Sequence, residues 1–236
     1  MKKIIYITEQ FPYPPNSGGK IKTLGTLNTL AQKFQVHLVS FSPEKVSQQQ
    51  QSYLKKKLAS SQVIVDSSIN HHPKNQKQKL FKNWLQGTPY LVSQYKNRVA
   101  HFKIQHLIDQ VSPDVIHIDH LNMTQYLPEN KACTWVYEEH NLESALVWSR
   151  AKHMTHLKTK VFLMIDAVMT YYYEQKNIPR FDAVFTISHH DHVKLKARFP
   201  QQKIYPYLPT ILRKKIKRQP RAGKLLFIGD MTWQPN

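Results

Sequence analysis

Acidic residues, cysteine and long apolar runs are scarce in this chain, and each shortage removes a class of protein. The 236 residues include a single cysteine, Cys133, so no disulfide can form within the chain. Its neighbours, in KACTWVY, indicate a buried strand residue rather than a nucleophile. The longest apolar stretch, Val161 to Tyr173, has thirteen residues and contains Asp166, whereas a helix needs roughly 20 apolar residues to span a bilayer. The sequence therefore predicts no internal disulfide and no transmembrane helix.

The shortage of acidic residues leaves a large positive charge. Against 34 Lys and Arg stand 15 Asp and Glu, a formal net charge of +19. An anionic partner is expected, and nucleic acid, an anionic membrane face and phosphorylated substrates all fit. Apolar residues make up 41% of the chain, enough for a globular core. The N-terminal apolar run stops at Thr8 and is followed by Glu9, which favours a cytoplasmic chain over a secreted one.

The stretch from Phe11 to Leu30, FPYPPNSGGKIKTLGTLNTL, predicts a loop that enters a helix. An apolar run at Ile4 to Ile7 precedes it as a strand, and the spacing of Ile21, Leu24, Leu27 and Ala31 is that of one helical face. Gly18 and Gly19 stand where the chain turns into the helix. Glycine there permits unusual backbone dihedrals and leaves the helix N–H groups open to an anion. A plain solvent-exposed turn is the alternative.

Strand-like and helix-like segments alternate along the rest of the chain. This alternation predicts an α/β fold: a Rossmann-like, doubly wound, mainly parallel sheet with helices on both faces. We expect the apolar middle of the long helical pattern at 142–177 to lie in the core. The further strands are expected at 36–41, 63–65, 113–119, 134–141, 183–187 and 204–208, and the helices at 44–59, 80–111 with a break at 87–89, 142–177 and 188–199.

Polar residues close the fourth and fifth predicted strands. His117, Asp119 and His120 follow one strand, and Glu138 to Asn141 follow the next. If the strands are parallel, these groups share the edge at which the glycine loop lies. A metal site at His117, Asp119 and His120 is conceivable, but alternate residues of a strand point to opposite faces, so His120 would not share a face with the other two. We favour polar residues at the edge of the sheet over a metal site.

Four ordered stretches resemble one known family. FPYPPNSGGK, EHNLESALVWSR, YEQKNIPRFDAVFTISHHD and FIGDMTWQPN are similar, in this order, to motifs in the amino-terminal half of glycosyltransferase family 4, whose members have two facing Rossmann-like domains, the GT-B fold. The resemblance implies an acceptor-side domain at 1–212, a basic linker at 213–223, and at 224–236 the first strand and loop of an otherwise missing nucleotide-sugar-binding domain. IYPYLPTIL departs from the family, in which an Asn-Gly-Val turn often precedes the linker.

The resemblance also implies an activity. It is retaining transfer of a sugar from a nucleotide-sugar to a cell-envelope or capsular glycan or a lipid-linked acceptor, as in polysaccharide biosynthesis, and the chain alone would be an incomplete, inactive half. The nucleotide-sugar is a co-substrate; no metal or other cofactor is implied. His140 matches the family histidine that contacts the transferred sugar, with an orienting or polarising role. The residues expected to border donor and acceptor are Gly18, Gly19, Lys20, His120, Asn141 and Glu143.

Two further interpretations follow from charge. The chain could instead be a basic anion- or nucleic-acid-binding Rossmann-like module without catalysis, although it carries no helix-turn-helix, RNA-binding or zinc motif. Residues 80–103 also combine cations with aromatic and apolar side chains, which suits a peripheral contact with anionic lipid at the inner face of a membrane. These residues are Phe81, Lys82, Trp84, Leu85, Tyr90, Lys96, Arg98 and Lys103.

Overall fold

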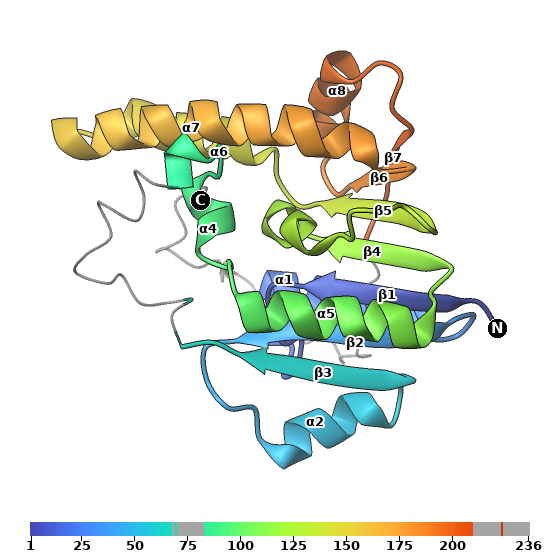
Figure 1. The fold of residues 1–236 in the computed structure, drawn as a ribbon. Helices are drawn as coiled ribbons and strands as arrows, with labels where there is room; N and C mark the ends of the chain where they lie inside the picture. Colours follow the sequence, from blue (N-terminus) through green and yellow to red (C-terminus); the bar gives the residue numbers. More distant parts are fainter. Residues whose placement is uncertain (68, 70–82, 210–222, 224–236) are drawn as a thin grey trace.

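A single parallel sheet organises the protein. The computed structural model describes residues 1–67, 69, 83–209 and 223, and it contains a seven-stranded sheet in the order β3-β2-β1-β4-β5-β6-β7, parallel throughout (Figure 1). The predicted Rossmann-like, doubly wound fold is therefore confirmed. The strands are β1 (Lys3–Thr8), β2 (Gln35–Ser42), β3 (Ser60–Val65), β4 (Val115–Asp119), β5 (Thr134–Glu139), β6 (Ala183–Thr186) and β7 (Ile204–Pro206).

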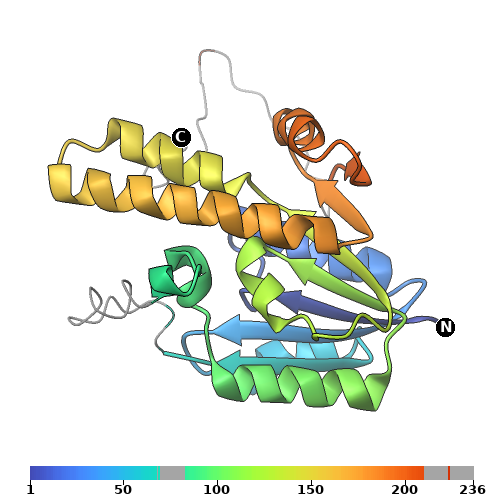
Figure 2. The same ribbon diagram turned by 45° about the horizontal axis from the view of Figure 1, so that its top comes forward.

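The winding of the chain reverses between β1 and β4. From β1 the chain moves outward to β2 and β3, then returns to place β4 on the other side of β1. Because crossovers between parallel strands are right-handed, this reversal moves the helices from one face of the sheet to the other. Figure 2 shows both helical layers. The helices are α1 (Gly18–Leu30) and α2 (Gln48–Lys55), then α4 (Tyr90–Ser93), α5 (Arg98–Val111), α6 (Glu143–His153), α7 (Leu157–Asn177) and α8 (His189–Arg198), with short 3₁₀ turns η1 (Leu121–Tyr126) and η2 (Ile178–Arg180).

Side-chain caps start several of these helices. The Ser17 hydroxyl accepts a hydrogen bond from the backbone N–H of Lys20, and Ser47 with Gln50 forms a capping box at α2. Ser188 caps α8 by accepting from the N–H of Asp191, as its position in the sequence predicted. Each cap satisfies a backbone donor that has no partner within the helix.

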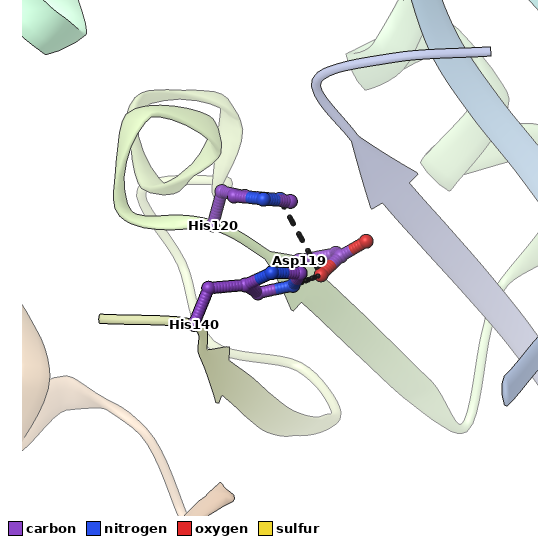
Figure 3. Close-up of side chains that lie close together, drawn as sticks. All are labelled: Asp119, His120 and His140. Carbon is purple, nitrogen blue, oxygen red and sulfur yellow. Dashed lines mark hydrogen bonds and ion pairs between the residues drawn. The ribbon is translucent and has the colours of Figure 1, made fainter. Parts of the chain in front are cut away.

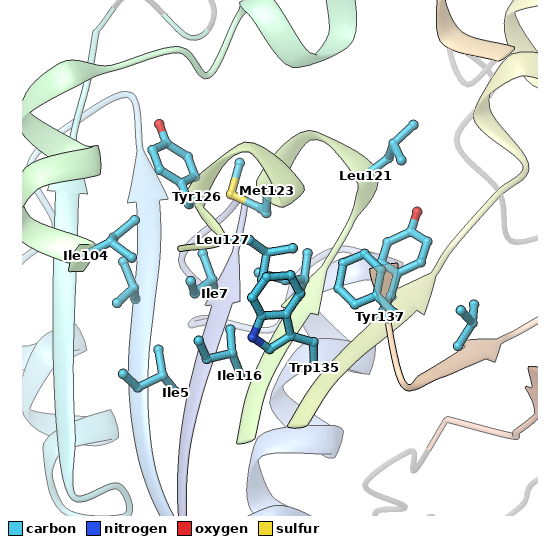
Figure 4. Close-up of a cluster of buried hydrophobic side chains, with 14 of the residues drawn as sticks. Ile5, Ile7, Ile104, Ile116, Leu121, Met123, Tyr126, Leu127, Trp135 and Tyr137 are labelled. Carbon is cyan, nitrogen blue, oxygen red and sulfur yellow. The ribbon is translucent and has the colours of Figure 1, made fainter. Parts of the chain in front are cut away.

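The larger of two apolar clusters lies between the sheet and the later helices. Along β1, Ile5 and Ile7 face this cluster, whereas Tyr6 faces the smaller cluster beneath α1 and α2. Trp135 and Tyr137 of β5 extend the larger cluster towards β6 (Figure 4). Cys133 is half-buried beside it, and burial raises the pKa of its thiol. Cys133 lies one residue before β5, so the prediction of a buried strand residue is wrong in both burial and placement.

The long helical pattern at 142–177 is interrupted at residues 154–156, which divide it into α6 and α7. The prediction that its apolar middle lies in the core is wrong. The buried face of α7 is polar instead, because partners on neighbouring elements satisfy its side chains. The Asp166 carboxylate accepts from the N–H of Tyr90 at 2.8 Å and from Nε1 of Trp84 at 3.2 Å. The buried residues of α7 are Asp166, Ala167, Thr170, Glu174 and Asn177.

A buried ion pair joins α7 to α8. Glu174 is fully buried, and its Oε2 lies 2.5 Å from Nη1 of Arg198. The same carboxylate accepts from the N–H and the hydroxyl of Ser144, at 2.9 and 2.6 Å. A charge without water needs such partners, since an unpaired buried ion is costly.

Several sequence-based predictions concern segments outside the described residues. The linker predicted at 213–223, except Gly223, and the strand predicted from residue 224 lie there, as do Phe81 and Lys82. Lipid binding by 80–103 stays a prediction, but the rings of Trp84 and Tyr90 lie against Phe162 of α7, at 5.1 and 6.0 Å between centroids. Among the helices in the described ranges, none combines the length and apolarity needed to cross a bilayer.

Replacing Glu174 tests how much the buried Glu174–Arg198 ion pair contributes to stability. Glu174→Ala leaves the Arg198 guanidinium without its counter-charge, and we expect the free energy of unfolding to fall by about 3–5 kcal/mol in a denaturant titration. Asp182→Ala is the matched control, because Asp182 pairs with Lys131 at an exposed site, where such pairs contribute at most about 1 kcal/mol. Equal losses in the two variants would contradict a special role for the buried pair.

Candidate functional site

Three charged or polar side chains meet at the edge where β1, β4 and β5 end. Lys22 comes from the second turn of α1, Asp119 from the last position of β4, and His140 from the residue that follows β5. Nζ of Lys22 lies 2.7 Å from Oδ1 of Asp119 and 2.6 Å from Nε2 of His140, and that Nε2 lies 2.5 Å from the same Oδ1. The two side chains that close strands β4 and β5 thus converge on one cation (Figure 3 shows Asp119 and His140). Crevices at such a reversal of strand order are where open α/β sheets bind ligands.

A second carboxylate shares the Lys22 ammonium. Oε1 of Glu138 lies 2.6 Å from Nζ of Lys22, and its Oε2 accepts from the Tyr6 hydroxyl and contacts Nε2 of His117, both at 3.1 Å. Oδ2 of Asp119 accepts from the Thr23 hydroxyl at 2.9 Å. Three of the four carboxylate oxygens have hydrogen-bond partners, and Oε1 of Glu138 has the Lys22 ammonium as its ion-pair partner. Paired in this way, two buried acids can stay ionised.

The pKa values follow from these contacts. Burial alone would raise the pKa of Asp119, but Lys22, His120 and His140 outweigh it and hold the pKa well below its usual range. Burial likewise opposes ionisation of Glu138, but the hydrogen bond from His117 and the charge of Lys22 lower its pKa. Both carboxylates are consequently anionic at neutral pH.

His140 is poised as a neutral imidazole. Burial is the main reason that its pKa lies below the usual value; neighbouring His120 also lowers it, and Asp119 opposes both. Within the described residues the ring meets Lys22 and Asp119 through Nε2 alone; with Asp119 anionic, Nε2–H donates to Oδ1, and the nearby Lys22 ammonium donates to that carboxylate rather than to the ring. Nδ1 is thereby the nitrogen left for a ligand.

His120 stacks on His140 and has a strained backbone. The ring centroids are 3.6 Å apart at an interplanar angle of 26° (Figure 3). The φ angle of His120 is 83°, a value that residues other than glycine rarely adopt. Surrounding structure must hold such a residue in place, and strain of this kind gathers at functional sites. Here it turns the imidazole over the ring of His140.

Gly18 and Gly19 lie one turn before Lys22 on α1, and one of the two roles predicted for them is wrong. Gly18 and Gly19 are the first residues of α1 and neither has a positive φ, so the prediction that they supply unusual dihedrals is wrong. Their N–H groups precede the first intrahelical hydrogen bond, from Ile21 to Ser17. A Cβ at Gly18 would meet nothing within 4 Å, and one at Gly19 would lie 2.6 Å from Nε2 of Gln10. The open helix N-terminus stays a prediction.

The other predicted site residues lie farther from the centre of the cluster. Lys20 is half-buried in the first turn of α1, and Asn141 is half-buried directly after His140. Glu143 begins α6, and loss of hydration raises the pKa of its carboxyl to about 7, although His120 opposes this rise. Within the described ranges, neither Asn141 nor Glu143 hydrogen-bonds to the Lys22–Asp119–His140 cluster.

The residues that could hold a metal ion differ from the set considered from the sequence. Asp119, His120 and His140 offer ligand atoms within 4.8 Å of one another, whereas His117 turns to Glu138. The set weighed from sequence, with His117 in it, is therefore wrong. The Lys22 ammonium already contacts Asp119 and His140 at hydrogen-bond distance, so a metal ion on these atoms would have to displace a lysine.

Sequence reasoning missed Lys22, the central cation of the site. Lys20 and Lys22 are two positions apart and point about 200° away from each other on a helix. Leu24 and Leu27 of the predicted apolar stripe are buried, but Ile21 is 36% exposed and Lys22 is buried in its place. The available signal was the polar pair Lys22–Thr23 one turn after the glycines, which is buried.

Replacing Lys22 tests the electrostatic account through pH. Lys22→Met leaves Asp119 and Glu138 buried without their cation, so their folded-state pKa values rise above the unfolded ones. Stability in the variant then falls as pH rises, and we expect a loss of about 3–5 kcal/mol near pH 7.5 that shrinks near pH 5, where protons replace the cation. Thermal unfolding at both pH values measures it. Lys131→Met, at an exposed pair, should show a small loss at either pH; an equal loss at both pH values in Lys22→Met would refute the account.

Comparison with known proteins gives a likeness of fold. No family model and no curated protein sequence matches the chain. Solved structures do match: sucrose-phosphate synthase from Thermosynechococcus elongatus (11% identity, 88% of this chain and 48% of that chain, TM-score 0.53) and a UDP-glucosyltransferase from Polygonum tinctorium (10%, 90% and 54%, 0.53). UGT2 from Phytolacca americana, complexed with UDP-2fluoro-glucose and pterostilbene, matches at 12% identity over 91% of this chain and 55% of that chain, with a TM-score of 0.50. The chain spans about half the length of these structures and shares their Rossmann-like α/β fold.

Proposed function

We propose that this chain is the acceptor-side half of a glycosyltransferase that moves a sugar from a nucleotide-sugar to an acceptor. One observation carries the proposal: the Lys22–Asp119–His140 cluster lies at the strand reversal, one turn from the N-terminus of α1. The likeness of fold to a UDP-glucosyltransferase, and to a protein complexed with UDP-2fluoro-glucose, supports the same reading. The finer proposal, retaining transfer to a cell-envelope or capsular glycan or a lipid-linked acceptor, rests on the motif resemblance.

The chemistry assigns each group a task. A glycosidic bond forms between the acceptor oxygen and the anomeric carbon, the bond from that carbon to the diphosphate breaks, and the acceptor proton passes to the departing phosphate. Neutral His140, held by Asp119 through Nε2, would orient or polarise the sugar through Nδ1. The N–H groups of Gly18 and Gly19, with Lys20, would meet the negative charge that develops on the diphosphate.

The proposal divides the work between two halves. The nucleotide would be held mainly by a second domain, so the chain of 236 residues should bind common nucleotide-sugars weakly in calorimetric titration. Micromolar binding by this chain would contradict that division. A basic anion-binding module without catalysis is the competing function, and it predicts that no form of the protein transfers sugar.

His140→Ala tests the site in a form of the protein that transfers sugar. We expect turnover to fall by about 10²–10³-fold with a smaller change in KM for the donor, because a contact that strengthens in the transition state acts on kcat. His153→Ala is the matched control, since His153 is exposed on α6 and, among the residues that the structure describes, hydrogen-bonds to Ser149 of its own helix alone. Lost thermal stability with unchanged turnover would make His140 structural instead.

Gly19→Val tests the helix N-terminus. The added side chain meets the flexible end of Gln10, which can move, so the melting temperature should hardly change. Transfer should fall at least about tenfold, because the new methyl groups cover N–H groups proposed to meet the phosphate. Kinetic assay beside a thermal melt separates the two effects; full activity in Gly19→Val would remove the α1 N-terminus from the site.

A further inference from the structure

Helix α7 is amphipathic in the inverted sense, with its apolar face towards solvent. Seven large apolar side chains on it are exposed, by between 38% and 72%. On an ideal helix they fall within one arc of about 120°, while the buried side carries the polar residues described above. The exposed set is Leu157, Val161, Met164, Ile165, Val168, Tyr171 and Tyr172. A surface helix normally buries its apolar face against the protein. An exposed apolar face of this kind marks a surface that another molecule contacts.

Cations flank this apolar arc. Lys158 and Lys160 lie about 100° and 60° from Leu157 on opposite sides of the helix axis. The preceding helix α6 adds Trp148, 39% exposed, and the cations Arg150 and Lys152. The acidic residues of 143–177 are only Glu143, Asp166 and Glu174, which are half-buried or buried. The solvent-facing side of the hairpin therefore joins apolar surface to positive charge with no exposed carboxylate.

The apolar arc continues into an open hollow between α6, α7 and α8. Its volume is about 770 Å³, and it is lined by apolar and aromatic side chains with two cations, including Trp148, Val168, Tyr171, Tyr172, Lys194 and Arg198. The Arg198 guanidinium lies 3.8 Å from the ring centroid of Tyr171. Aromatic rings beside cations are the side chains found where apolar chains meet charged headgroups.

We propose that the α6–α7 hairpin lies flat on an anionic lipid bilayer, with the exposed arc of α7 in the headgroup boundary and Lys158 and Lys160 at lipid phosphates. Long lysine side chains can reach outward while their stems cover apolar surface. The charge pattern favours lipid over a second copy of the chain, because a symmetric pairing of two such helices would bring the same cations together without a carboxylate between them.

The position of the hairpin gives this docking a consequence. In Figures 1 and 2 the hairpin projects beyond the edge of the sheet at which the strands end, the edge that carries the Lys22–Asp119–His140 cluster. A bilayer lying along the hairpin would extend past that edge, where a lipid-carried acceptor would come within reach of the cluster. This consequence rests on the proposed glycosyltransferase function, whereas lipid binding itself does not.

Vesicle co-sedimentation of the 236-residue chain tests the proposal. The wild type should bind vesicles of phosphatidylcholine mixed with phosphatidylserine, bind pure phosphatidylcholine far less, and release as salt is added. V161E/V168E places two carboxylates in the arc at positions that are each 47% exposed, and binding should fall by about tenfold or more.

A second double variant, with the same change in charge as V161E/V168E, is the matched control. V65E/V193E makes the same two Val→Glu changes at exposed positions of β3 and α8, 49% and 54% exposed, and should bind within about twofold of the wild type if the arc is the docking face. Three results would overturn the proposal: no binding by the wild type at low salt, equal losses in the two double variants, or light scattering that shows a wild-type dimer which V161E/V168E abolishes. The last outcome would assign the arc to a second copy.

Discussion

The Lys22 ammonium, held between two buried carboxylates, is the interaction on which the candidate site depends. Asp119 and Glu138 end neighbouring strands on the same face of the sheet, and without a cation two such anions could not remain buried and charged. The lysine therefore fixes α1, and with it the N-terminus of this helix, against β4 and β5. The position of α1 against the sheet and the ionised state of the two carboxylates both depend on Lys22.

The same balance explains the state of His140. A carboxylate beside an imidazole normally favours the protonated ring, but burial and the stacked ring of His120 shift the balance towards the neutral form. Asp119 is in turn stabilised as an anion by Lys22 rather than by a proton. The result is a neutral imidazole of fixed orientation, which suits polarising a bound sugar better than carrying a permanent charge.

Helix α7 packs in the reverse of the usual orientation. Its polar side faces the protein because Trp84, Tyr90, Ser144 and Arg198 supply partners for Asp166 and Glu174. Its apolar side is then left outward. Protein interiors accept polar groups when every one is paired, and here that pairing leaves an apolar helix face free for another surface.

The sequence by itself determined the class of fold and the neighbourhood of the site. Strand-like runs alternating with helical patterns predicted the parallel sheet, and polar residues after β4 and β5 predicted a shared edge, because strand direction and side-chain alternation are local properties. Ser188 was recognisable as a cap for the same reason. Only tertiary structure decided that Lys22, not Lys20, faces Asp119, that His140 replaces His117 beside His120, and that α7 turns its apolar side to solvent. The contacts of Lys22 and Asp166 involve partners more than seventy residues away in the chain, and His120 meets His140 across two neighbouring strands. Periodicity reports which residues share a face but not which face is covered.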